Sequence, residues 1–245
     1  MTLLALVPNH YNGPMPRPFL LLWLLLLCSL FATAQSPPAA TASQSPSTGQ
    51  APSAVAFTLD FPGSQPEHYA IRVASSGPNH YESSGRLAAD SDDIDSFDFD
   101  FTISTETRSR IFALAAKAGY FQKDVDTHRK NLAFTGKKTL RYTDAARTGE
   151  ATYNYSENSA VEDLTSLFQN LSTTLEFGHR LDYDHRYQKL ALNEELKRLE
   201  EMAQSNMLTE VSAIQPILEK IVADQSVINV ARARAQRLLA SVDRR

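Results

Sequence analysis

Cysteine is almost absent from this sequence of 245 residues, which contains one cysteine and one tryptophan, both within the first 34 positions. A chain with a single thiol forms no internal disulfide, which excludes the small disulfide-stapled scaffolds. From residue 35 onward no thiol remains, so a cysteine nucleophile is excluded as well. The chain must therefore be held together by its hydrophobic core.

An excess of positive charge is also missing. The chain carries 24 basic and 28 acidic side chains, a formal net charge of −4. Residues 55–180 hold 13 basic and 18 acidic side chains, whereas residues 181–245 hold ten of each. We therefore expect no nucleic-acid partner, because phosphate backbones bind to a concentrated positive field.

The longest hydrophobic run is short. It covers residues 19–31, follows a basic residue and precedes Ala-Thr-Ala at positions 32–34. Thirteen helical residues span about 20 Å, less than the roughly 30 Å of a bilayer's hydrocarbon core. This pattern is typical of a secretory signal peptide. We expect residues 1–34 to be cleaved between Ala34 and Gln35, which leaves an exported protein, periplasmic or secreted, with no membrane span in the mature chain.

Two alternatives bear on this segment. Positions 32–34 could lengthen the hydrophobic run to an uncleaved inner-membrane signal anchor. The residues before Met15 include no Lys or Arg and hold the hydrophobic run away from the first residue. We therefore expect translation to start at Met15.

A tether follows the signal peptide. Residues 35–54 consist of Gln, Ser, Pro, Ala, Thr and Gly, with no charge and no large apolar side chain. Such a segment buries too little surface to offset the entropy of ordering it, so we expect it to be disordered.

Residues 55–180 predict an α+β domain. Large apolar residues alternate with small or polar ones in residues 55–61, 69–73 and 97–103, as in strands with one face on a core. Helices are expected from Ser104 to Gly119 and from Ala160 to Gly178. The expected fold is an antiparallel sheet of six or seven strands with two helices on one face. Further strands are expected at residues 81–87, 131–135, 139–143 and 151–155, with a tight hairpin at Gly136-Lys137.

Residues 181–245 predict an all-helical C-terminal segment. Helices are expected at residues 190–202, 208–222 and 227–242 from the spacing of their apolar residues. The sequence from Ile214 through Pro216 and Asp224 to Leu239 resembles a single HEAT-type helical hairpin.

Metal and acid–base candidates cluster in the first half of the domain. An acidic run includes Asp90, Asp92, Asp93 and Asp95, but it departs from the calcium-loop pattern, so a polar loop is the favoured interpretation. The weak metal candidates are Asp90, Asp92, Asp95, His68 and His80, where the two histidines could face each other across a hairpin beside Glu82. We expect no cofactor, metal or catalytic residue.

A basic patch is the candidate binding surface. Its members surround the expected hairpin: Arg129, Lys130, Lys137, Lys138 and Arg141. Such a cluster can orient an acidic partner, or it can keep strand edges from aggregating.

The layout as a whole resembles that of uncharacterised exported bacterial proteins that combine a signal peptide, a Pro/Ser tether and a small α+β domain. The resemblance implies no active site. The expected function is that of a non-enzymatic binding or scaffolding module for another envelope protein or an extracellular macromolecule. The alternative is an exported hydrolase that uses a pair of carboxylates around residues 82–95.

Overall fold

The computed structural model describes residues 52–86 and 93–242. The expected signal peptide with its cleavage site at Ala34 and Gln35, the tether up to residue 51, Asp90 and Asp92 lie outside the described residues. The last residue of the expected tether, Ala54, already belongs to the first strand.

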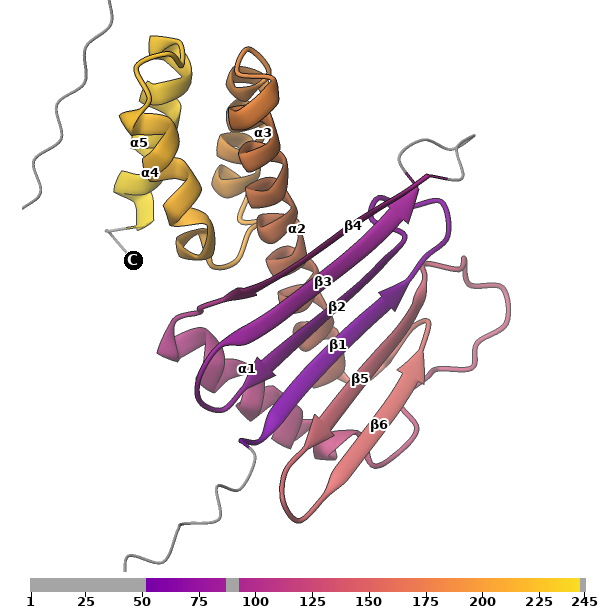
Figure 1. The fold of residues 1–245 in the computed structure, drawn as a ribbon. Coiled ribbons are helices and arrows are strands. Elements are labelled where there is room, and N and C mark those ends of the chain that lie inside the picture. The colour runs from indigo at the N-terminus through magenta and orange to yellow at the C-terminus, as the bar shows by residue number, and fades with distance from the viewer. Residues whose placement is uncertain (1–51, 87–92, 243–245) are drawn as a thin grey trace, which may run out of the picture. The chain divides into compact units, whose positions relative to one another are not determined.

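The fold is α+β, with one antiparallel sheet of six strands and five α-helices in the described part of the chain. The strand order is β4-β3-β2-β1-β5-β6, and every neighbouring pair is antiparallel (Figure 1). The strands are β1 (Ala54–Asp60), β2 (His68–Ala74), β3 (Asn79–Arg86), β4 (Ile94–Phe101), β5 (Lys137–Thr143) and β6 (Thr148–Tyr153).

Two helices cover one face of this sheet, as expected. They are α1 (Thr105–Lys117) and α2 (Ser159–Tyr187), and both lie on the same side of the strands in Figure 1. Ser104 caps α1 by accepting a hydrogen bond from the Thr107 amide, which satisfies a donor that the first turn leaves free.

The alternation of the strands gives the sheet an inner face towards the helices. Phe57, Ile71 and Leu140 on this face are fully buried. Phe57 stacks on Phe168 of α2 with 5.4 Å between ring centroids. Because the other half of each strand points away from this core, the opposite face of the sheet carries small and polar side chains. We call it the outer face.

The C-terminal part is helical, as the sequence predicts. After α2 the chain forms α3 (Leu192–Gln204), the short 3-10 helix η2 (Val211–Ile214), α4 (Gln215–Ala223) and α5 (Asn229–Val242). These helices bury a second apolar cluster around the end of α2. The first cluster ends at Leu175 and the second begins at Phe177, so the two cores meet within one continuous helix.

Three expectations from the sequence are wrong. Helix α2 does not end near Gly178 but continues to Tyr187. Residues 131–135 are not a strand, and Gly136-Lys137 is not a hairpin turn. Gly136 has a φ of 96°, and a side chain there would collide with Leu59 and Phe61, so the chain passes here close to the end of β1. The hairpin that precedes β6 lies at residues 144–147 instead.

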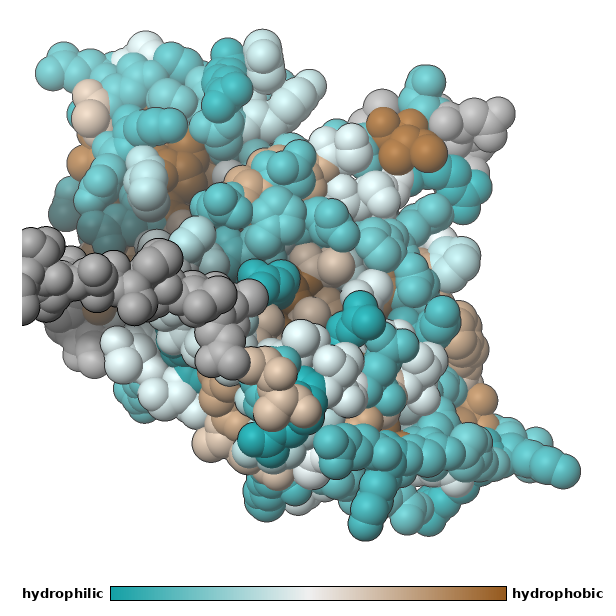
Figure 2. All heavy atoms as spheres, turned by 60° about the horizontal axis from the view of Figure 1, so that its bottom comes forward, coloured by the Kyte–Doolittle hydropathy of each residue, from teal (hydrophilic) through white to brown (hydrophobic). Residues whose placement is uncertain are grey.

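The exterior is mainly hydrophilic on the face drawn in Figure 2, where hydrophobic side chains form small separate areas. Within residues 52–86 and 93–242, no helix is long and apolar enough to cross a membrane.

Candidate functional site

The outer face of the sheet gathers several of the residues singled out from the sequence. No helix of the described chain covers this face. Pairing across β3, β2, β1 and β5 places His80, Arg72, Ala56 and Arg141 in one row. The row ends in acidic residues on the two edge strands: Asp100 on β4 and Glu150 on β6.

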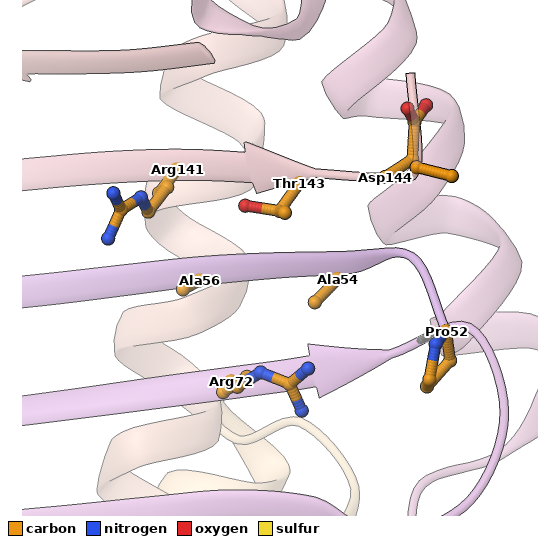
Figure 3. Close-up of a pocket in the computed structure, with 8 residues that line it drawn as sticks. Pro52, Ala54, Ala56, Arg72, Arg141, Thr143 and Asp144 are labelled. Carbon is orange, nitrogen blue, oxygen red and sulfur yellow. The ribbon is translucent and has the colours of Figure 1, made fainter. Parts of the chain in front are cut away.

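A shallow groove lies at the centre of this row. Its volume is about 320 Å³, close to the lower limit of about 300 Å³ for small-molecule pockets. Figure 3 shows Arg72 and Arg141 on either side of Ala54 and Ala56, on the side of the sheet away from the helices. We call it the arginine groove, and its lining consists of Pro52, Ala54, Ala56, Arg72, Arg141, Thr143, Asp144 and Ala145.

The two arginines are weakly engaged within the fold. In the described part of the chain, the side chain of Arg72 makes no hydrogen bond or ion pair. The Arg141 Nε lies 3.4 Å from the Glu150 carboxylate, and both side chains are more than half exposed. An exposed pair of this kind contributes little to stability, typically below about 1 kcal/mol. Both guanidinium groups are therefore available to a ligand.

Asp144 is the acidic residue of the groove, but its carboxylate is already occupied. It accepts hydrogen bonds from the Ala146 amide at 2.7 Å, the Arg147 amide at 2.8 Å, the Arg147 Nε at 2.9 Å and the Tyr142 hydroxyl at 2.9 Å. These donors, the Ala146 amide first, hold the pKa of Asp144 below its usual range. Since Arg147 balances its charge, Asp144 competes little for the two groove arginines.

The charge of the outer face changes across the sheet. The centre carries Arg72 and Arg141, whereas the β3–β4 side carries Glu82, Asp98 and Asp100, of which Glu82 and Asp98 are directly paired. The groove is therefore a positive site bounded by acidic side chains.

His68 and His80 lie on the outer face but do not face each other. His68 is paired with Ser84 and His80 with Arg72, four residues apart along β3, which corresponds to about 13 Å. Each histidine instead lies against an aspartate: His68 Nδ1 is 2.6 Å from Asp60, and His80 Nδ1 is 3.0 Å from Asp100. Among the described residues, no group of three or more His, Cys, Asp or Glu side chains could hold a metal ion.

Asp95 lies at a second cleft, between β4 and α2. Its carboxylate is 3.7 Å from His179 Nε2, and the His179 ring packs on Phe97 with 3.9 Å between centroids. Glu176 lines the same cleft of about 230 Å³ and accepts a 2.6 Å hydrogen bond from the buried Tyr81 hydroxyl. One residue of the acidic run thus lies beside the imidazole of His179 and lines the same cleft as the Glu176 carboxylate.

The structure divides the predicted basic patch. Lys137 and Arg141 are on the outer face, whereas Lys138 points to the inner side and is only 6% exposed. Lys138 Nζ donates to Asn154 O and Thr135 Oγ1, both at 2.9 Å. The other two members, Arg129 and Lys130, lie in the connection before β5. Arg129 forms an ion pair with Glu157, and Lys130 is exposed.

Two residues of these sites were not predicted from the sequence. Arg72 falls on the polar side of its strand, but its position across Ala56 from Arg141 follows only from the β1–β2 and β1–β5 pairing. Glu176 was not predicted because it lies on a helix with an apolar stripe, and the sequence pattern gives no sign of its hydrogen bond from Tyr81.

Comparison with known proteins gives no further information about either site, because no family model, no curated protein and no solved structure matches the chain.

Proposed function

We propose that this chain is a non-enzymatic binding module whose arginine groove recognises an acidic group on another macromolecule. The observation that carries the proposal is the pair Arg72 and Arg141, which flank a floor of alanines and lack strong partners of their own. Arginine remains charged at any physiological pH and offers a planar set of donors to oxyanions.

The chemistry of the groove supports binding rather than catalysis. Its lining contains no histidine, and its one carboxylate, Asp144, is saturated with donors. A general acid or base needs a proton that it can exchange near neutral pH, which neither arginine supplies.

Export is the second part of the proposal. The short hydrophobic run at residues 19–31 and the Ala-Thr-Ala sequence after it support a signal peptide, so the partner would be another envelope protein or an extracellular macromolecule. The tether that follows contains no charged and no large apolar side chains, which supports a module held at a distance from its attachment point.

Affinity capture with charge-reversed protein tests the proposal. The protein is immobilised and exposed to an envelope extract, in parallel with the double variant Arg72→Glu/Arg141→Glu. The matched control is Arg110→Glu/Lys123→Glu, which reverses two exposed positive charges elsewhere. We expect an acidic partner that wild type and control retain and that the charge-reversed variant loses. Equal capture by all three proteins would contradict the proposal.

A second function, an exported hydrolase with paired carboxylates, is favoured by one observation. Asp95 and Glu176 line the same cleft, with His179 beside Asp95. Two carboxylates in one cleft can serve as acid and base. A panel of chromogenic glycosides and esters tests it with Asp95→Asn and the outer-face control Asp98→Asn. A turnover that Asp95→Asn abolishes and Asp98→Asn keeps would establish it; equal rates in all three would remove it.

A further inference from the structure

We propose that the arginine groove binds a terminal phosphate group, carried as a phosphomonoester on the macromolecular partner or present as free phosphate. This inference rests on the proposed function, because it names the acidic group that the outer face would recognise.

The arrangement of donors is the first argument. Arg72 and Arg141 flank β1 on neighbouring strands, so their backbones are about 10 Å apart and their long side chains can close on a ligand from both sides. Each guanidinium presents two parallel N–H bonds that match a pair of oxygens. The four N–H groups of two such forks can be shared among the three terminal oxygens of a phosphomonoester, whereas a carboxylate offers only two oxygens to the same four donors.

The floor between the arginines is the second argument. Ala54 and Ala56 are the β1 residues beneath the groove, and their methyl groups leave its volume open. Thr143, paired with Ala54 across the β1–β5 ladder, adds a hydroxyl on the same side. A larger residue at position 56 would fill the space in which both guanidinium groups meet the ligand.

The acidic border is the third argument, and it selects a compact anion. Asp100 and Glu150 terminate the row that contains both arginines, and Glu82 lies one row away on β3. A long polyanion laid across the sheet would pass these carboxylates and be repelled. A single phosphate at the centre carries up to two negative charges and meets both arginines without reaching the border.

Equilibrium dialysis of the full chain with radiolabelled inorganic phosphate tests the inference. We expect saturable binding of one phosphate per chain. Arg72→Ala and Arg141→Ala should each weaken it at least tenfold, because each removes a charge-assisted bidentate contact. Ala56→Leu should weaken it similarly while both arginines remain. The control Arg110→Ala/Lys123→Ala should bind like the wild type.

Two further arms identify the source of the phosphate. Competition by phenyl phosphate as strong as by inorganic phosphate supports a phosphomonoester ligand, whereas exclusion of phenyl phosphate supports free phosphate. Sodium acetate at the same ionic strength should compete weakly.

Three results would overturn the inference: no saturable phosphate binding, binding that survives the loss of both arginines, or stronger binding of acetate than of phosphate. The last result would leave the proposed function intact, because the groove would then recognise a carboxylate. If the protein bound phosphate but captured no partner, the proposed function would be contradicted and the phosphate site would stand.

Discussion

At the scale of single residues, buried tyrosines combine core packing with hydrogen bonds on the inner face of the sheet. Tyr81 is fully buried between the sheet and α2. Its hydroxyl donates to Glu176 at 2.6 Å and lies 3.0 Å from the Ser172 hydroxyl. A buried polar group is tolerated when its hydrogen bonds are satisfied, so this network fixes how α2 docks on β3.

Removal of the Tyr81 hydroxyl should destabilise the fold. In Tyr81→Phe the ring still fills its site, but Glu176 and Ser172 lose their buried partner, which costs about 1–3 kcal/mol. Urea unfolding monitored by circular dichroism measures this loss. The control is Tyr187→Phe, because Tyr187 is 70% exposed and should show no change. Equal stability of Tyr81→Phe and the control would contradict this role.

Stability should also fall at alkaline pH. Burial raises the pKa of Tyr69, Tyr81 and Tyr153 far above the ordinary value near 10. The unfolded chain therefore loses these protons first, so the stabilisation is complete below pH 10 and decreases as the pH rises above it. We expect a constant urea midpoint up to about pH 9 and a decline above pH 10. The phenolate absorbance of these three residues should rise only with unfolding. Their ionisation near pH 10 in a folded protein would refute the prediction.

Lys138 and Arg72 show what the sequence could and could not predict at this scale. Leu140 and Tyr142 on β5 point inward, and the same parity places Lys138 inward, so its burial was predictable from the period-two pattern. Its charge suggested the opposite. The position of Arg72 across Ala56 from Arg141 was not predictable, because it requires that β1 lie between β2 and β5, a long-range arrangement that no local pattern encodes.

At the scale of elements, periodicity predicted the strands and helices well where they pack on the core. Periodicity failed for residues 131–135, which alternate like a strand but form a loop outside the sheet. Phe134 is 57% exposed, and its ring lies edge-on to Phe61, just after β1, with 5.8 Å between the ring centroids. It failed again at Gly178, where the second apolar cluster continues α2 past a residue that usually ends a helix.

A polar latch joins the end of α2 to the connection between α4 and α5. The Asp224 carboxylate lies 2.6 Å from Lys189 Nζ and 3.0 Å from His185 Nε2, and it also accepts from Ser226. The hydrogen bond from Lys189, together with those from Ser226, holds the pKa of Asp224 below its usual range. The latch therefore stabilises the fold above the ordinary carboxyl pKa of about 3.9 and is lost as the pH falls below it.

Neutralisation of this carboxylate should loosen the helical part. In Asp224→Asn, we expect faster amide hydrogen exchange in the α4–α5 connection at pH 7, because Lys189 and His185 lose their anionic partner. At acidic pH, below the folded pKa of Asp224, wild type and variant should converge. Glu201→Gln, an exposed position on α3, provides the control and should exchange like wild type. Unchanged exchange in Asp224→Asn at pH 7 would show that the latch contributes nothing.

At the scale of the whole described chain, two hydrophobic cores share one helix. The sheet core contains Leu164, and the helical core contains Leu196; both side chains are fully buried. Besides α2, a side-chain contact links the two parts, because the Glu210 carboxylate accepts hydrogen bonds from the Ser104 amide at 3.0 Å and the Ser104 hydroxyl at 2.6 Å. We expect the dependence between the cores to be one-sided, because the helical core packs on the end of α2, while the first half of α2 packs on the sheet.

Matched leucine truncations should reveal this one-sided dependence. Leu164→Ala and Leu196→Ala each remove a fully buried side chain, at a cost of about 2–5 kcal/mol. We expect Leu196→Ala to speed hydrogen exchange in α3, α4 and α5 while β1 to β3 keep their protection, because the sheet core does not use the lost contacts. Leu164→Ala should speed exchange in the sheet and in the C-terminal helices together, because α2 supports both. If Leu196→Ala opened the strands as much as the helices, the two cores would form a single cooperative unit and the one-sided dependence would be wrong.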